Sequence, residues 1–349
     1  MDAHDVIDRL RTVEDPHLDG DIVELGVVRS VNVDSHIHIE LALEAKGSAK
    51  EASIIDAVKQ ALEHTNIPLT IDRVQPSGHD PASDVRGSVA NVIAVASGKG
   101  GVGKTTVSVN LAAGLAASGA AVGLFDADVY GPNAPMMLAG EERPTVSDDG
   151  QLIPPEAFGM KVMSMAYLVG EDDPIIWRGP MVHKVLTQLW DDVAWGELDY
   201  LVIDLPPGTG DTQLTLLQTI PLTGAVIVTT PQDVALHDAT KGLEMFARHE
   251  TNVLGIVENM AGFRCPDCGS VHEIFDAGGG ERLAEVHDLP FLGSIPLDPT
   301  IRTGDRPVVL DGEEESATKF QELASLVADN VGIVNRRRLE PSLLGDQAE

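Results

Sequence analysis

Hydrophobic residues are spaced differently before and after residue 89. In the first part, short runs alternate between apolar and polar positions, which predicts strands that bury only one face. The elements predicted there are a helix with Val6, Ile7 and Leu10 on one face, strands within 21–33 and 36–43, a helix over 49–64 and a strand at 70–74. We therefore predict a small α+β domain over residues 1–75.

After residue 89 the predicted strands are apolar at almost every position. They occupy 89–96, 120–126, 200–204, 225–230 and 253–258, and helical segments separate them. Apolar strands that alternate with helices are typical of a parallel sheet buried on both faces. The predicted fold class is therefore α/β, a doubly wound and mostly parallel sheet. We place this domain at 89–330, a polar linker at 76–88 and a loose tail at 331–349.

Composition narrows the classes of function. The chain has 349 residues and a formal net charge of −31, and a field of that sign repels the phosphates of nucleic acids and anionic membranes. There is no apolar signal core and no apolar run of about 18 residues. Two closely spaced cysteines do not form a disulfide framework of the secreted kind. We expect a soluble, cytoplasmic protein without nucleic-acid or membrane partners.

A glycine-rich segment joins the first apolar strand to an alanine-rich helix. Residues 98–105 match the pattern GxxxxGK[ST] in the strand, loop and helix context that this motif requires. Backbone amides of such a loop hold phosphates, Lys104 can reach the β- and γ-phosphates, and Thr105 can ligate Mg²⁺. The sequence therefore predicts a site for ATP and Mg²⁺, formed by Gly98, Lys99, Gly100, Gly101, Val102, Gly103, Lys104, Thr105 and Thr106.

A second lysine, Lys99, stands early in this loop, where Lys104 already serves the phosphates. With it the segment resembles the deviant Walker A class of nucleotide-binding proteins, KGGxxGK[ST]. Members of that class enclose two nucleotides between two protomers and use this lysine across the interface. The resemblance implies a nucleotide-driven homodimer.

Three aspartates follow apolar strands at the edge where open α/β sheets bind ligands. Asp126 and Asp128 lie at the C-terminal end of the second strand, and Asp204 ends the third strand before Leu-Pro-Pro-Gly. The resemblance implies that Asp126 and Asp204 support Mg²⁺ and that Asp128 orients the attacking water, as phosphoryl transfer requires. It also implies that Asn259, directly after the fifth strand, contacts adenine.

The two cysteines, Cys265 and Cys268, have the spacing of metal ligands. Three interpretations compete, namely a redox dithiol, half of a zinc site with His272, and two ligands of an iron–sulfur cluster. One chain supplies two thiolates, whereas a cluster held by cysteine normally takes four ligands. A symmetric dimer would supply the other two. This count favours a cluster that bridges two subunits and permits either [4Fe–4S] or [2Fe–2S].

Several further segments resemble the Mrp/ApbC family of iron–sulfur cluster carrier ATPases over 89–330. They are KGGVGKTT at 99–106, DADVYGPNAP at 126–135, IWRGPM at 176–181, DLPPGTGD at 204–211, VENM at 257–260, CPDC at 265–268 and IPLD at 295–298. The first 75 residues resemble a small domain of cytosolic iron–sulfur assembly proteins, through 14–16 and 21–28. That domain often carries a cysteine where this chain reads EAKGSA at 44–49, so we expect partner docking there rather than cluster binding.

The resemblance implies an ATPase in which Lys99, Lys104 and Asp128 are catalytic. It also implies a [4Fe–4S] cluster held at the homodimer interface by Cys265 and Cys268. The expected partners are a second copy of the chain, proteins that donate or assemble clusters, and apo iron–sulfur proteins that receive them.

Three other functions share parts of these motifs. A spatial-positioning or partitioning ATPase needs a basic tail or patch, and here Arg336, Arg337 and Arg338 are followed by Leu-Glu-Pro within an acidic chain. An electron donor resembling dinitrogenase reductase has cluster cysteines that lie far apart in sequence, unlike CxxC. A zinc-stabilised scaffold switched by nucleotide is the third alternative.

Overall fold

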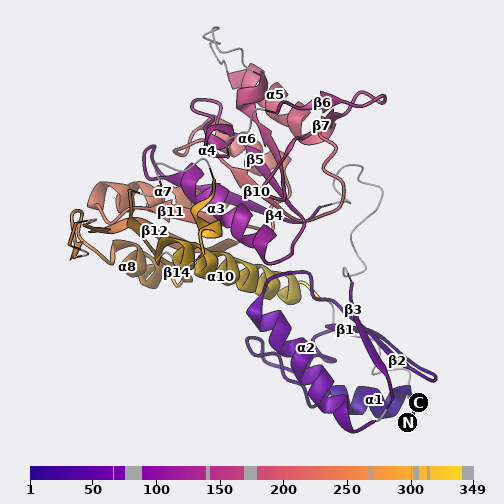
Figure 1. Ribbon diagram of the computed structural model, residues 1–349. Coiled ribbons are helices and arrows are strands. Elements are labelled where there is room, and N and C mark those ends of the chain that lie inside the picture. The colour runs from indigo at the N-terminus through magenta and orange to yellow at the C-terminus, as the bar shows by residue number, and fades with distance from the viewer. Residues whose placement is uncertain are drawn as a thin grey trace. The chain divides into compact units, whose positions relative to one another are not determined.

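The computed structural model describes residues 1–65, 67–74, 89–138, 142–168, 179–265, 267–268, 270–299, 301, 306–312 and 315–339. The chain divides into two compact units (Figure 1). One comprises Met1–Ser83 with Ala328–Glu349, and the other comprises Asp84–Val327. The expected linker at 76–88 lies outside the described residues.

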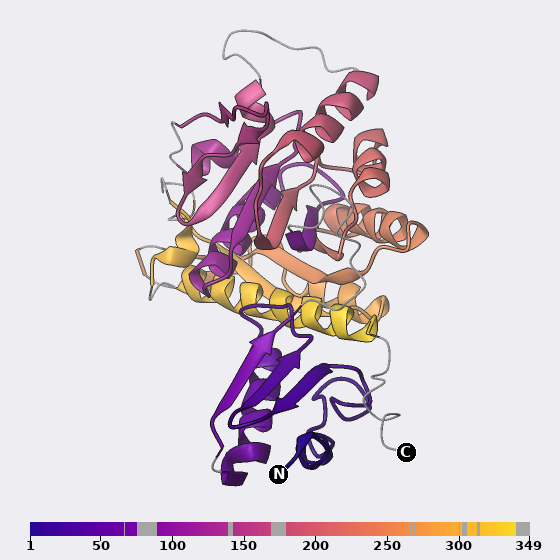
Figure 2. The ribbon, with the colours of Figure 1, turned by 90° about the vertical axis from the view of Figure 1, so that its right-hand side faces the viewer.

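The small unit is a three-stranded sheet with helices packed on one face (Figure 2). The elements are α1 (Ala3–Leu10), β1 (Val28–Val33), β2 (Ile37–Leu41), α2 (Ala49–Leu62), the 3₁₀ turn η1 (Glu63–Thr65) and β3 (Leu69–Arg73). Strand β2 lies in the middle, antiparallel to β1 and parallel to β3. Alternate residues of β2, namely Ile37, Ile39 and Leu41, are fully buried, as the period of two predicts.

Two expectations for this unit need correction. Residues 21–27 are not strand, because the Asp21 carboxylate accepts the backbone N–H groups of Val23 and Glu24 and closes a turn, so β1 begins only at Val28. The loose tail expected from residue 331 is wrong for 331–337. Helix α10 (Glu315–Arg337) continues through these residues, because Val331 and Arg336 are buried in this unit.

The large unit confirms the predicted α/β fold. Its main sheet has the order β13-β12-β11-β4-β10-β5-β9-β8, and β14 also pairs with β12. The pairs are parallel except for β8 with β9 and β12 with β13. The strands are β4 (Val89–Ala96), β5 (Val122–Asp126), β8 (Glu156–Ala157), β9 (Met160–Ser164), β10 (Leu198–Asp204), β11 (Gly224–Thr229), β12 (Val253–Arg264), β13 (Val271–His272) and β14 (Phe291–Leu297).

Helices pack on this sheet (Figures 1 and 2). They are α3 (Lys104–Ala117), α4 (Ala134–Met137), α5 (Gly179–Asp192), α6 (Asp211–Thr219), α7 (Asp233–Arg248), α8 (Gly279–Val286) and the first part of α10. Helices α5, α6 and α7 supply buried apolar side chains to a core shared with β4, β5 and β10. Helix α3 packs closely against α10, since a β-carbon on Gly114 would lie only 2.9 Å from the Cβ of Ala324.

The parallel strands bring the predicted site residues to one edge of the sheet. Strands β4, β5, β10, β11 and β12 run in the same direction, so their carboxyl ends meet at this edge.

Strands β6 (Thr145–Val146) and β7 (Leu152–Ile153) form a separate two-stranded sheet. Among the described residues, the helices are too short or too polar to cross a membrane.

Candidate functional site

The glycine-rich loop lies between β4 and α3, with Lys104, Thr105 and Thr106 in the first turn of the helix. Two of its glycines leave no room for a side chain. A β-carbon on Gly98 would lie 2.2 Å from the backbone of Asp238, and one on Gly103 would lie 2.1 Å from Nδ2 of Asn259. Gly103 also has a φ of 82°, a left-handed conformation that favours glycine. The loop backbone is therefore held close to both α7 and β12.

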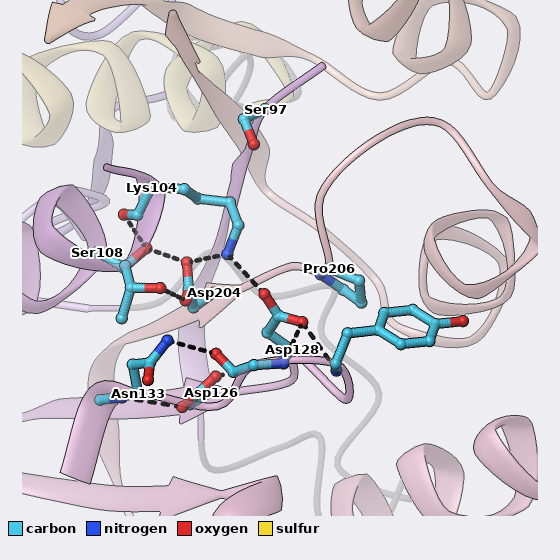
Figure 3. A network of polar contacts seen from close by, with 12 residues as sticks. Ser97, Lys104, Ser108, Asp126, Asp128, Asn133, Asp204 and Pro206 are labelled. Carbon is cyan, nitrogen blue, oxygen red and sulfur yellow. Dashed lines mark hydrogen bonds and ion pairs between the residues drawn. The ribbon is translucent and has the colours of Figure 1, made fainter. Parts of the chain in front are cut away.

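Lys104 is almost completely buried and faces two of the predicted carboxylates (Figure 3). Its Nζ lies 2.6 Å from Oδ1 of Asp204 and 3.9 Å from Oδ2 of Asp128. Asp204 also accepts hydrogen bonds from the hydroxyls of Thr105, at 2.7 Å, and Ser108, at 2.6 Å. The structure thus joins the phosphate loop to the end of β10 through one carboxylate.

Asp126 is fully buried at the end of β5, and its oxygens accept hydrogen bonds from inside the fold. Oδ2 accepts from the backbone N–H of Ala134 and the hydroxyl of Ser164, each at 3.0 Å, and Oδ1 accepts from the N–H of Asp128 at 3.3 Å. Burial, followed by the nearby charge of Asp204, raises the pKa of Asp126 to about 7. Asp126, one of the predicted metal ligands, therefore also shapes the loop after β5.

Asp128 has one oxygen turned to the loop backbone and one turned to Lys104. Oδ1 accepts the N–H groups of Tyr130 at 3.0 Å and Gly131 at 3.2 Å, while Oδ2 is the atom that faces Lys104. Tyr130 itself is largely exposed. The carboxylate is thus fixed in direction at the edge where a nucleotide would bind.

Lys99 takes no part in the contacts described above between Lys104 and the aspartates. Its backbone carbonyl accepts the Ser97 hydroxyl at 3.0 Å, and the Ser97 carbonyl accepts the N–H of Gly208 at 2.9 Å. The hydrogen bond from Lys241 lowers the pKa of Asp238 on α7, and the charge of Lys99 adds a smaller effect. Lys99 follows Gly98, whose backbone packs against Asp238, so this part of the loop lies beside α7.

Asn259 contacts the phosphate loop directly. Its Nδ2 donates to the carbonyl oxygen of Val102 at 2.8 Å. The preceding residue, Glu258, is fully buried, and its carboxylate accepts the N–H groups of Gly278 at 3.1 Å and Gly280 at 2.6 Å. The Glu258 carboxylate thus lies at the positive N-terminus of α8. This part of β12 is fastened to the loop on one side and to α8 on the other.

The two cysteines lie on the hairpin that β12 and β13 form. The backbone N–H of Cys265 donates to the carbonyl of Ser270 at 2.9 Å, and Cys268 is exposed. Hydrogen bonds from Ser270, followed by one from the Cys265 thiol, lower the pKa of Cys268. A lowered pKa favours the thiolate, which is the form that binds metals. Within the part of the chain that the structure describes, three or more His, Cys, Asp or Glu side chains do not gather into a metal-ion site.

Comparison with known families places both units. A family model described as the NUBPL iron-transfer P-loop NTPase matches residues 88–328, and one described as an iron–sulfur cluster assembly protein matches residues 3–68. The chain belongs to the iron-transfer P-loop NTPase family. The expected family resemblance is thereby confirmed for both parts of the chain.

Relatives of this family match at high identity. An iron–sulfur cluster carrier protein of Synechocystis is 42% identical, over 94% of this chain and 97% of its own length. Those of Haemophilus influenzae and Escherichia coli are 44% and 51% identical, over 91% and 69% of this chain and 89% and 66% of their own lengths.

Solved structures agree with the fold. A nucleotide-binding protein of Archaeoglobus fulgidus in complex with ADP has a TM-score of 0.56 and 38% identity, and covers 70% of this chain and 91% of its own. The cell division ATPase MinD of Pyrococcus furiosus has a TM-score of 0.52 at 24% identity, covers 68% of this chain and 98% of its own, and supports the fold alone.

Three residues of this family member were missed by the sequence reasoning. Ser108 lies one helical turn after Lys104 on α3, and that spacing of four could have placed it beside the same carboxylate. Ser164 ends β9, the parallel neighbour of β5, at the position paired with Asp126. Glu258 lies in a strand that is otherwise apolar. No local pattern indicates that its carboxylate accepts N–H groups at the start of α8.

Proposed function

We propose that this chain is an ATP-hydrolysing iron–sulfur cluster carrier, which binds a [4Fe–4S] cluster between two copies and transfers it to apoproteins. One observation carries the proposal. The hairpin with Cys265 and Cys268 extends from β12 at the same edge of the sheet as the phosphate loop. The lowered pKa of Cys268 and the count of two thiolates per chain support a cluster shared by a symmetric dimer.

ATP binding would exchange one partner of Lys104 for another. In this structure Nζ is paired with Asp204, whereas phosphates in the glycine-rich loop would lie within its reach. Thr105 and Asp204 present oxygen atoms next to each other, which is the donor set that Mg²⁺ prefers, and Asp126 lies near enough for the charge of Asp204 to raise its pKa. Mg²⁺ bound there would neutralise phosphate charge. With Asp204 holding the ion, Lys104 would pair with phosphate in place of Asp204.

Hydrolysis needs a water molecule held in line with the γ-phosphate. We assign this role to Asp128, and the assignment is supported by the loop hydrogen bonds that fix Oδ1 and leave Oδ2 facing Lys104. The N–H of Gly208, which donates to Ser97 here, would turn to the γ-phosphate while ATP is intact. Lys99 would act on the nucleotide of the second copy, so catalysis and homodimer closure would depend on each other.

Anaerobic reconstitution with iron and sulfide tests the cluster. We expect about four irons per dimer and a broad visible absorbance band for the wild type, and neither for the variant Cys265→Ser/Cys268→Ser. Light scattering on the same samples measures the mass. About two irons per dimer would replace the [4Fe–4S] assignment by [2Fe–2S]. Bound zinc, or no metal, would overturn the carrier proposal and favour a nucleotide-switched scaffold.

A further inference from the structure

Strand β12 touches the phosphate loop through Asn259. The side chain is 5% exposed, and its Nδ2 donates to the Val102 carbonyl at 2.8 Å. Val102 stands between Gly101 and Gly103, whose φ angles are 80° and 82°. The direction of the Val102 carbonyl therefore depends on the backbone of the segment whose amides would bind phosphate.

Two successive residues of β12 pack on this loop. A β-carbon on Gly103 would lie 2.1 Å from Nδ2 of Asn259 and 3.6 Å from the terminal methyl group of Met260. Neighbouring side chains of a regular strand point to opposite faces. Here Met260 has a φ of 60°, a left-handed conformation that is unfavourable for a residue with a bulky side chain. The pairing of β12 with β14 also shifts register between Asn259 and Phe263. The strand is bent where it meets the loop.

The bent strand leads directly into the cysteine hairpin. Beyond Met260, β12 pairs with β13 through Phe263 and Arg264 and with β14 through Phe263, and the next residue is Cys265. Before the bend, β12 is anchored, because Glu258 pairs with β11 and accepts two N–H groups of α8. Asn259 therefore lies on the same strand as the hairpin, between the part of β12 that α8 holds and the part that ends at Cys265.

We propose that Asn259 is a positioning residue that couples the phosphate loop to the Cys265 hairpin within one chain. Nucleotide bound to the loop then changes the environment of Cys265 and Cys268 without a second copy. The inference rests on the proposed nucleotide site but not on the proposed cluster. Because coupling between two binding equilibria is reciprocal, a ligand of the two cysteines changes nucleotide affinity by the same factor as nucleotide changes the affinity for that ligand.

The test measures thiol reactivity in the metal-free chain. The rate at which an aromatic disulfide reagent modifies the cysteines is measured with and without saturating Mg·ADP. Titration calorimetry verifies nucleotide binding, and light scattering verifies that the mass is unchanged. In the wild type we expect the two rates to differ by about two- to tenfold, the range of one hydrogen bond. In Asn259→Asp, an isosteric change that sets an acceptor against the Val102 carbonyl, we expect the ratio to approach one.

Asn252→Asp is the matched control. Asn252 precedes β12, and its Nδ2 donates to the carbonyl of Thr223 at 3.3 Å, so the same chemistry is removed at the opposite end of the strand. We expect this variant to keep the wild-type ratio. A ratio of one in the wild type, an undiminished ratio in Asn259→Asp, or an equal loss in Asn252→Asp would each overturn the coupling. Failure of the wild type to bind Mg·ADP would instead refute the proposed nucleotide site.

Hydrogen exchange of the wild type repeats the test without a substitution. Mg·ADP should alter exchange in a peptide covering residues 260–268 together with the phosphate loop. The Cys265 amide, which donates to Ser270, is the reporter. An unchanged hairpin beside a protected loop would contradict the proposal, even if Asn259→Asp does not fold.

Discussion

Among the described residues, a buried cation faces two carboxylates in each unit of the chain. In the large unit, Lys104 faces Asp204 and Asp128. In the small unit, Arg336 lies with Nε 2.6 Å from Asp15 and Nη1 3.5 Å from Glu51, all with fully buried side chains. The charges are alike, but their surroundings differ.

The cluster around Lys104 lies at the carboxyl edge of the sheet beside the phosphate loop, where a ligand can replace the carboxylate as a partner. The cluster around Arg336 is enclosed. Glu51 also accepts from the backbone of Ala45 and from Arg73, and Asp329, on the same helix as Arg336, accepts the hydroxyl of Ser48. A buried ion pair therefore indicates a functional site only where its partners can be exchanged, and the second cluster instead fastens the end of α10 within its unit.

Removing the enclosed cation should have the largest effect on stability. Arg336→Ala would leave Asp15 and Glu51 buried without their cation, and we expect the free energy of unfolding to fall by about 3–5 kcal/mol. Chemical denaturation measures it. Arg337 is the matched control, because it is adjacent and exposed, so Arg337→Ala should stay within about 0.5 kcal/mol of the wild type. Equal losses would show that the enclosed pair contributes little.

Removing the exchangeable cation should instead affect turnover most. We expect Lys104→Ala to lower the ATP hydrolysis rate by about 10²–10³-fold, because it removes charge stabilisation of the transferred phosphate. Its loss of stability should be smaller than that of Arg336→Ala, since Thr105 and Ser108 still donate to Asp204. Lys241→Ala, which breaks an exposed ion pair on α7, serves as the control for phosphate-release assays. Undiminished hydrolysis in Lys104→Ala would contradict the assignment.

A hydroxyl of the same cluster should have a moderate effect. Ser108→Ala removes one of the donors to Asp204 but leaves Lys104 and Thr105, so we expect a stability loss of about 1 kcal/mol. Thermal unfolding measures this loss. Ser118, at the end of the same helix, is exposed and bonds only a helix carbonyl in the described contacts, so Ser118→Ala should change the midpoint much less. A reversed order would show that Ser108 is not part of the buried cluster.

The smallest expected effect is a change of stability with pH. It concerns Glu44, which accepts a hydrogen bond from Asn335, the residue before Arg336. Burial, followed by the charge of Glu51, raises the pKa of Glu44 from 4.5 to about 7. The folded state holds this proton more tightly, so the contribution of Glu44 to stability is present below pH 4.5 and is lost as the pH rises to about 7.

Glu44→Gln removes this dependence and keeps an oxygen that can accept from Asn335. We expect the variant to be more stable than the wild type above pH 7, by about 1 kcal/mol after allowance for partial exposure. Denaturation at several pH values measures the difference, which should vanish near pH 4. A difference that stays constant with pH would contradict the titration of Glu44.

Local patterns predicted much of the fold and of the candidate site. The apolar strands placed Asp126, Asp204 and Asn259 at one edge, because parallel strands end together. The same reasoning failed for Arg336, which was predicted to lie in a loose tail and is fully buried. It also failed for 21–27, where a single aspartate closes a turn within an alternating run.

The sequence by itself determined the class of the large domain, the phosphate loop and the cysteine pair, because each depends on residues that are close together along the chain. Only the tertiary structure decided how these parts meet. The bond from Asn259 to Val102 and the pair of Arg336 with Asp15 join residues that are far apart in sequence, at 2.8 Å and 2.6 Å. Such contacts depend on how strands and helices pack, and the residues of a single segment do not determine that packing.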